Sequence, residues 1–204
     1  MNITHNEIKD HALQQLRNYS KWGESIGVII VAAIIAIAAS IIPFGGLLIA
    51  GPLALGIAGF YLKISRNGDG VFNNMFDGFK NFGNALIANF LVGLLTGLAF
   101  ILLIVPGIVV ACGYSQVNRI MHDNPQMNGT DAMRASWKLM DGKKMDFFML
   151  NLSFIGWAIL CIFTLGIGFL FLSPYIGVTN SKYYDEITGR GNELVDSIGQ
   201  DLVS

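Results

Sequence analysis

The residue types that most often carry chemistry are few in this sequence and form no recognisable constellation. The three histidines, His5, His11 and His122, lack the spacing of metal ligands. The two cysteines, Cys112 and Cys161, lie within long uncharged runs, where a buried thiol acts as a small apolar side chain. We find no phosphate-binding glycine loop, no His-Glu-x-x-His pair and no nucleophile with a nearby base. We therefore expect no enzymatic activity, no cofactor and no metal.

Four carboxylates crowd the segment between residues 119 and 146. Paired carboxylates can bind a divalent cation. Their spacing here is irregular and basic residues lie between them, so the pattern favours local salt bridges over a metal site. The four residues are Asp123, Asp131, Asp141 and Asp146.

The overall composition explains why reactive side chains are scarce. Hydrophobic residues make up 53% of the chain and charged residues only 13%, whereas charged residues are about a quarter of an average soluble domain. This composition predicts a membrane protein whose main surroundings are the lipid bilayer. The net charge of −1 and the absence of a basic block argue against nucleic acid as a partner.

Three runs without any Asp, Glu, Lys or Arg dominate the chain, at residues 25–62, 81–118 and 147–181. A helix crosses the hydrocarbon core with about 20 residues, so each run is long enough for two helices. Proline and glycine near the centre of each run predict a reversal there. The fold class that follows is all-α and polytopic, with six transmembrane helices in three hairpins. The predicted turn residues are Pro43, Gly45 and Gly46, then Pro106 and Gly107, then Gly166 and Gly168.

Two further prolines, Pro52 and Pro174, fall inside the second helix of the first and third hairpins, where we expect kinks. Together with Pro106 they show a weak internal echo, because each precedes a tyrosine by eight or nine residues. Three repeated hairpins would explain this spacing, and chance is the alternative. The tyrosines are Tyr61, Tyr114 and Tyr183.

The basic residues predict the orientation in the membrane. All 13 Lys and Arg residues lie outside the three runs. In a three-hairpin protein they fall on one side, and the positive-inside rule assigns that side to the cytoplasm. We therefore expect a multi-pass protein of the cell membrane with both termini in the cytoplasm. A secretory signal ending near residues 36–40 is the alternative for the first helix, but apolar residues continue beyond it, which argues against cleavage.

The expected domain organisation has three parts: an N-terminal amphipathic helix (1–24), one membrane domain (25–185) and a cytoplasmic tail (186–204). Apolar residues at helical spacing in the first part predict a helix lying on the membrane surface. A similar interfacial helix is predicted between the first two runs. Its apolar face consists of Phe72, Met75, Phe76 and Phe79.

The segment from Arg119 to Asp146 offers the greatest chemical variety outside the runs. Thr130 suits a helix N-cap and Gly142 suits a helix end, so we predict a short cytoplasmic helix between them. We expect this helix and the residues after it to bind a membrane-protein partner or lipid headgroups, with Ser136 and Lys138 on its polar flank. The alternative is a helix that only closes the end of the bundle. The candidate interaction surface is Met133, Ser136, Trp137, Lys138, Met140, Lys143 and Lys144.

The polar residues inside the runs are uncharged, which argues against ion-coupled transport. Asn89 and Asn151 are predicted to form hydrogen bonds between helices, each contributing about 1 kcal/mol or less. Gly93 and Gly97, four residues apart, predict close helix packing, either within the chain or at the face of a homo-oligomer.

Short motifs extend along the second half of the chain, among them "IVPGIVVACGYS", "ASWKLMDGKKMDFFMLNLSFIGWAIL" and "TLGIGFLFLSPYIGVTNSKYY". Together they resemble the bacterial integral membrane family catalogued as domain of unknown function nine-seven-five. The resemblance is most specific from Val105 onward and weaker before Asn81. It implies a six-helix bacterial membrane protein, distantly similar to the membrane domain attached to some glycerophosphodiester phosphodiesterases, and it implies no established activity.

These observations lead to two functional expectations. The first is a non-catalytic scaffold, accessory subunit or modulator of other membrane machinery. The second is a carrier or conduit for a lipid, a peptide or another amphipathic substrate, which would not require buried charge.

Overall fold

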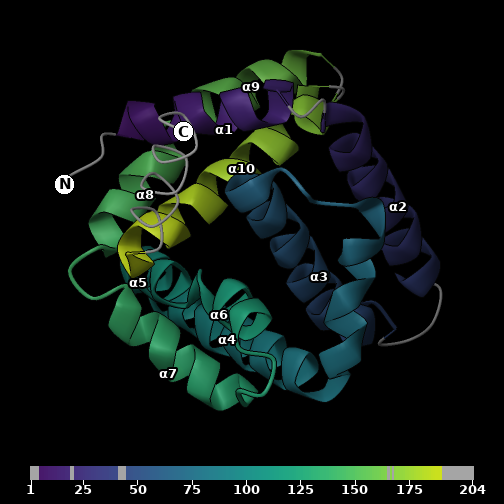
Figure 1. Ribbon diagram of the computed structural model, residues 1–204. Coiled ribbons are helices and arrows are strands. Elements are labelled where there is room, and N and C mark those ends of the chain that lie inside the picture. Colours follow the sequence, from purple (N-terminus) through teal and green to yellow (C-terminus); the bar gives the residue numbers. More distant parts are fainter. Residues whose placement is uncertain (1–4, 19–20, 41–44, 165, 167, 190–204) are drawn as a thin grey trace, which may run out of the picture.

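The computed structural model describes residues 5–18, 21–40, 45–164, 166 and 168–189, and the described residues form helices and turns without any strand (Figure 1). The predicted all-α class is therefore confirmed. The described elements, in chain order, are α1 (His5–Asn18), α2 (Trp22–Ser40), α3 (Gly45–Asn67), the 3₁₀ helix η1 (Phe72–Asn81), α4 (Phe82–Leu102), α5 (Ile104–Tyr114), α6 (Val117–Asp123), α7 (Gly129–Leu139), α8 (Lys144–Leu152), α9 (Ile155–Phe163) and α10 (Gly168–Thr188).

The reversals within the charge-free runs agree with the prediction in part. Pro43 lies outside the described residues, whereas Gly45 and Gly46 begin α3. In the third run, Gly166 adopts a positive φ of 86° between α9 and α10. Pro52 and Pro174 lie inside α3 and α10.

The second reversal corrects the expectation for Pro106 and Gly107. The chain turns at Leu103, the single extended residue between α4 and α5, with φ −162° and ψ 144°. Pro106 instead occupies the first turn of α5, where the missing N–H costs little because the first backbone donors of a helix have no partner within it.

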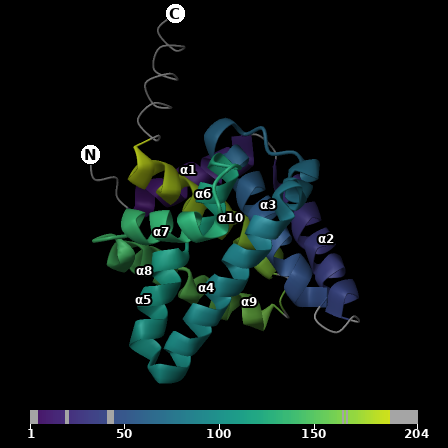
Figure 2. The same cartoon turned by 90° about the horizontal axis from the view of Figure 1, so that it is seen from below.

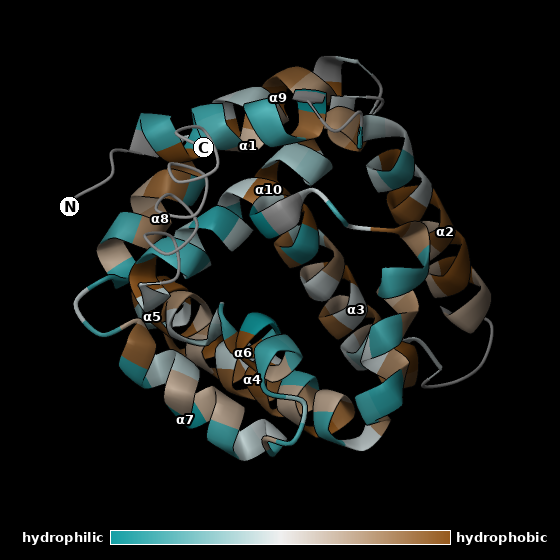
Figure 3. Cartoon of the chain, in the orientation of Figure 1, coloured by the Kyte–Doolittle hydropathy of each residue, from teal (hydrophilic) through white to brown (hydrophobic). Residues whose placement is uncertain are grey.

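Four helical stretches are long and apolar enough to cross a membrane: Trp22–Ala39, Leu48–Arg66, Phe72–Leu102 and Lys144–Ile162. Six spans are not confirmed. Helix α5 has 11 residues, about half the length that a straight crossing needs. A turn at Ser115 and Gln116 separates it from α6. Hydrophobic residues colour much of α2 and α9 in Figure 3, whereas hydrophilic residues are prominent on α1.

Helix α3 is the central element of the bundle and packs against η1, α4, α10, α6 and α2. Its contact with η1 is a backbone contact that two glycines permit. A Cβ on Gly56 would overlap the carbonyl oxygen of Met75, and a Cβ on Gly78 would overlap the carbonyl oxygen of Pro52. Met75 is fully buried in this contact, so η1 packs on protein through part of its predicted apolar face.

Helix α1 uses its predicted apolar face to pack on the bundle, while its place at the membrane surface stays a prediction. Its apolar residues Ile8, Ala12 and Leu16 recur every four residues and are all buried in the protein core. The helix packs mainly on α10. The amphipathic pattern therefore reflects packing on the bundle. The same helical periodicity is found in helices that pack on protein and in helices that lie on a membrane.

The helices give the molecule two distinct ends (Figure 2). The turn between α4 and α5 lies at one end, at the bottom of Figure 2, and its residues Ile101 to Val105 are 67–83% exposed. Helices α1 and α6 and the C-terminal end of α10 lie toward the other end. The charged side chains described next gather at that second end.

Candidate functional site

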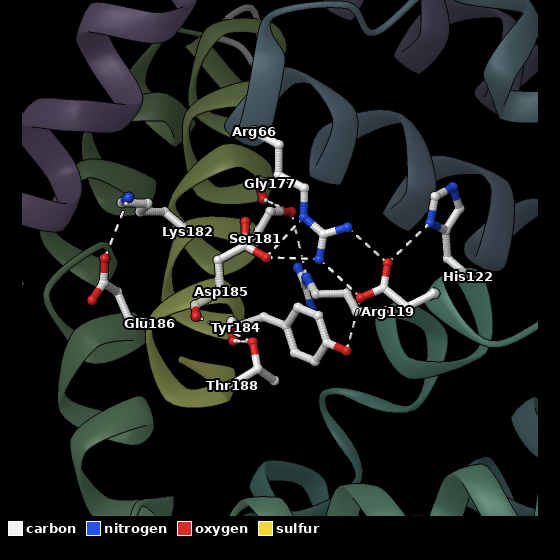
Figure 4. Close-up of polar contacts among 11 residues, drawn as sticks. Arg66, Arg119, His122, Gly177, Ser181, Lys182, Tyr184, Asp185, Glu186 and Thr188 are labelled. Atoms are coloured by element: carbon white, nitrogen blue, oxygen red, sulfur yellow. Dashed lines mark hydrogen bonds and ion pairs between the residues drawn. The ribbon is translucent and has the colours of Figure 1, made fainter. Parts of the chain in front are cut away.

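A buried ionic cluster joins the ends of α3, α6 and α10 (Figure 4). Arg66 of α3 donates two hydrogen bonds to Asp123, Nη1 to Oδ1 and Nη2 to Oδ2, both at 2.8 Å. It also donates from Nε and Nη2 to Oδ1 of Asp185, at 2.9 and 2.8 Å. The side chains of Asp123 and Asp185 are 4% and 1% exposed. One planar guanidinium thus holds two buried carboxylates, an arrangement for which arginine is better suited than lysine.

Neighbouring residues complete this cluster. The Tyr184 hydroxyl donates to Oδ2 of Asp123 at 3.1 Å, and Nδ1 of His122 lies 3.7 Å from Oδ1. Oδ2 of Asp185 has no hydrogen-bond partner among the described residues. Burial raises the pKa of Asp185, against the lowering effect of its hydrogen bond from Arg66. Because the effect of burial on the pKa is larger, Asp185 takes up a proton more readily than an exposed aspartate does.

Arg119 of α6 lies beside the cluster and is bonded more weakly. Its Nε donates to the Ser181 hydroxyl at 3.4 Å, and its Nη1 donates to Ser115 O and Gln116 Oε1 at 3.3 Å. No carboxylate of the described residues lies within 4 Å of it. An arginine side chain stays protonated in proteins, so Arg119 is a cation at neutral pH.

A cleft of about 540 Å³ opens beside Arg119, between α3, the α5–α6 junction and α10. Apolar side chains of α3 and α10 form most of its wall, and Ser115, Asn118 and Arg119 form its polar end. The hydroxyl of Tyr61, another lining residue, is buried and makes no hydrogen bond within 3.5 Å among the described residues; Ser173, also in the lining, is its polar neighbour. The cleft is thus apolar along its length and cationic at one end.

Sequence reasoning missed the ionic cluster and assigned one of its acidic members, Asp123, to local salt bridges. Asp123 pairs with a residue 57 positions earlier, not with a local base. In the described part of the chain, no ion pair joins Asp131, Asp141 or Asp146 to a basic residue, and all three are exposed. The signal that could have found part of the cluster is the proline–tyrosine echo, because Arg66 and Arg119 each lie five residues after the echoed tyrosine of their hairpin's second helix.

The predicted interaction surface on α7 is largely internal, which corrects that expectation. Met133, Ser136 and Met140 are buried at 7, 0 and 0% exposure. Ser136 lies inside because it bridges the break between α5 and α6. Its hydroxyl donates to Gly113 O at 2.8 Å and accepts from the backbone N–H of Gln116 at 3.3 Å. The helix begins at Gly129, after the N-cap Asn128 and not after Thr130.

The remaining members of that surface are divided between internal and exposed roles. Lys143 donates to Ile187 O at 3.3 Å. Lys144 lies with its Nζ 3.9 Å from the centroid of the Trp137 ring, and this ring also contacts Tyr114, at 5.2 Å between centroids. Lys138 is exposed. The geometry therefore fits a helix that closes the bundle, with Trp137 and Lys138 at its outer edge.

Substituting Ser136 by alanine is expected to lower the free energy of unfolding by about 1–3 kcal/mol, because the buried N–H of Gln116 loses its acceptor. Thermal unfolding in mild detergent measures the effect. Lys138→Ala, two positions away and exposed, is the matched control and is expected to change stability by less than about 0.5 kcal/mol. Equal stability of both variants would mean that Ser136 does not tie α7 to the helix break.

The predicted helix-packing residues differ in their surroundings. Asn89 of α4 donates to Asn118 Oδ1 of α6 at 2.8 Å, and Asn180 of α10 donates to Asn151 Oδ1 of α8 at 3.3 Å. Gly93 and Gly97 are exposed, and a Cβ on either would meet nothing within 4 Å. Within the described residues no helix packs on this glycine pair, so the predicted close packing is not formed among them.

The comparisons with known proteins identify a family but no activity. Residues 95–191 match the model of the family described as "Protein of unknown function (DUF975)". The match covers the motifs from Val105 onward and confirms the resemblance read from the sequence. Searches of curated proteins and of solved structures found no match. Among the described residues, no group of three or more His, Cys, Asp or Glu side chains could hold a metal ion.

Proposed function

We propose that the chain, which matches this family of unknown function, is a multi-pass protein of a bacterial cytoplasmic membrane. It would have three helical hairpins and both termini in the cytoplasm. The exposed apolar turn at Leu103 supports this topology, as does the position of the Arg66, Asp123 and Asp185 cluster, on helix ends away from that turn. Helices α5 and α6 would together supply the fourth crossing, and α9 and α10 would form the third hairpin.

Cysteine labelling tests the topology. In a background without Cys112 and Cys161, a cysteine at Leu103 is expected to react with a membrane-impermeant thiol reagent in intact cells, because it lies at the exposed outer turn. A cysteine at Gln126, which is exposed at the other end, is expected to react only after the membrane is opened. Labelling at Gln126 in intact cells would contradict the three-hairpin arrangement.

We propose further that the protein acts by association, as a scaffold, accessory subunit or modulator, and not by catalysis. The observation that supports this is the open face of α4 around Gly93 and Gly97. Small residues let two membrane helices approach closely, and this pair has no helix against it within the described chain. The simplest occupant is the same face of a second copy, because a two-fold contact places the two stripes together.

Cross-linking of the full chain in native membranes tests association through α4. Replacing both Gly93 and Gly97 by leucine is expected to abolish cross-linked dimers, because the larger side chains keep the backbones apart. The matched control is Gly156→Leu on α9, a glycine that is also exposed and open. Unchanged cross-linking in the double variant would reject this face as an interface.

A second candidate function, a binder or carrier of an amphipathic molecule, is supported by a separate observation. The cleft beside Arg119 has an apolar wall and a cationic end, which matches the two parts of an amphiphile. Its volume falls within the range of about 300–1,000 Å³ that is usual for small-molecule sites.

A further inference from the structure

We propose that the cleft between α3, α6 and α10 binds one anionic lipid, with an acyl chain along its apolar wall and the charged headgroup at Arg119. This inference deepens the second candidate function and rests on it, because it names the class of amphiphile.

The apolar wall suits a hydrocarbon chain. Ala54, Ile57 and Ala58 of α3 face Phe169, Leu172 and Ile176 of α10 across the cleft. The two alanines are only partly buried although they lie in the central helix, so small side chains leave the space open. Apolar area covered by an acyl chain would contribute to binding through close packing.

Arg119 is the recognition element at the polar end. Arg66 pairs with Asp123 and Asp185 through four hydrogen bonds. In contrast, no carboxylate of the described residues lies within 4 Å of Arg119. Its Nη2 makes no hydrogen bond there, and the bonds of its other nitrogens are 3.3–3.4 Å long. A phosphate or carboxylate oxygen offers shorter, charge-assisted bonds of about 2.7–2.9 Å.

The hydroxyl of Tyr61 is a second, independent pointer to a ligand. It belongs to a buried side chain that lines the cleft, and among the described residues it makes no hydrogen bond within 3.5 Å, although the Ser173 side chain of the same lining is a polar neighbour. A buried polar group without a partner costs about 1–3 kcal/mol. A headgroup or ester oxygen in the cleft would accept its hydrogen bond and remove that cost.

The position of the polar end favours a lipid over a soluble anion. Most of the α3 wall belongs to the apolar stretch Leu48–Arg66, while Arg119 lies with the charged cluster at the end of the bundle where α1 and α6 are found. A lipid would use both regions, with its headgroup level with the cluster. A soluble anion would leave the apolar wall empty.

Lipid retention by the purified full chain tests the inference. The protein is placed in nanodiscs of equal parts phosphatidylglycerol and phosphatidylcholine, extracted into mild detergent, and its bound lipid is quantified by mass spectrometry. Wild type is expected to retain about one phosphatidylglycerol per chain in preference to phosphatidylcholine. Ala58→Phe fills the cleft and is expected to lower that retention about tenfold, which corresponds to about 1.4 kcal/mol.

Two further variants separate the cleft from the protein surface. Ala36→Phe makes the same exchange on the exposed face of α2 and is expected to retain lipid as wild type does. Arg119→Gln is expected to lose the preference for phosphatidylglycerol while still retaining some phosphatidylcholine. Ala54→Phe repeats the cleft-filling test if either cleft variant does not fold.

The outcomes distinguish the inference from the function on which it rests. If wild type retains both lipids equally and Ala58→Phe lowers both, the chain binds amphiphiles but Arg119 does not select anions, and the inference fails alone. If the folded cleft-filling variants retain lipid as wild type does, the cleft is not the site and both fail. Displacement of the bound lipid by soluble glycerol phosphate would show that the apolar wall contributes nothing, and would also overturn the inference.

Discussion

Replacing Arg66 by leucine is expected to lower the free energy of unfolding by about 3–5 kcal/mol, which is the usual cost of removing one partner from a buried ion pair. The substitution leaves Asp123 and Asp185 buried together without the guanidinium that now bonds both. Thermal unfolding in mild detergent measures the loss. The control is Lys63→Leu, one turn earlier on α3, whose ion pair with Asp77 is partly exposed and is worth about 1 kcal/mol or less.

The pH dependence of the Arg66→Leu variant gives a second readout. Without the arginine, burial and mutual repulsion raise the pKa of both carboxyls above their unfolded values. The folded state then binds more protons than the unfolded state, so stability increases as the pH falls and is lost as it rises. Wild type has the same sign at Asp185, whose pKa burial raises, but a smaller slope because Arg66 opposes the shift.

Adding Asp123→Asn and Asp185→Asn to Arg66→Leu is expected to restore part of the stability, since amides carry no charge that needs a partner. If Arg66→Leu unfolds at the same temperature as Lys63→Leu, the cluster does not hold α3, α6 and α10 together.

Replacing Gly56 by alanine is expected to cost about 3 kcal/mol or more, at or above the upper end of the usual range for overpacking. The added methyl group would overlap the backbone carbonyl of Met75, and backbone cannot move aside as a flexible side chain does. The expected result is a large fall in the unfolding temperature. Protease sensitivity in η1 is expected to increase, because η1 can no longer pack closely on α3.

Gly156→Ala is the matched control because it makes the same exchange in a helix, α9, where nothing lies within 4 Å. Alanine favours helix by about 1 kcal/mol over glycine, so this variant is expected to be as stable as wild type or more so. Equal losses at Gly56 and Gly156 would indicate a general effect of glycine replacement and reject the α3–η1 contact as its cause.

The helices were largely predictable because hydrophobic runs and charge positions are local properties of the sequence. The charge-free runs gave the helical stretches, and Gly166 marked the third reversal. The turn at Leu103 was not predictable in the same way, because Pro106 is tolerated equally in a turn and in the first turn of a helix.

The site was less predictable because it depends on contacts between distant segments. Asp123 has basic neighbours in sequence, yet its partner Arg66 comes from another hairpin. Ser136 reads as part of a polar flank, yet it is buried because the helix break at Ser115 needs its hydroxyl. In both cases the periodicity of one helix cannot identify which other helix covers it.

The shared use of Arg66 also sets an order of events during synthesis. Asp185 follows Arg66 by 119 residues, so at about 5–20 residues per second it leaves the ribosome roughly 6–24 s later. Helix α1 waits even longer, because it packs mainly on α10. During this interval Arg66 has at most one of its two carboxylates and the apolar face of α1 is uncovered. Chaperones and membrane proteases thus meet an incomplete bundle until α10 is made. A nascent chain truncated before α10 would keep an incompletely paired Arg66 and an uncovered apolar face of α1 for as long as it persists.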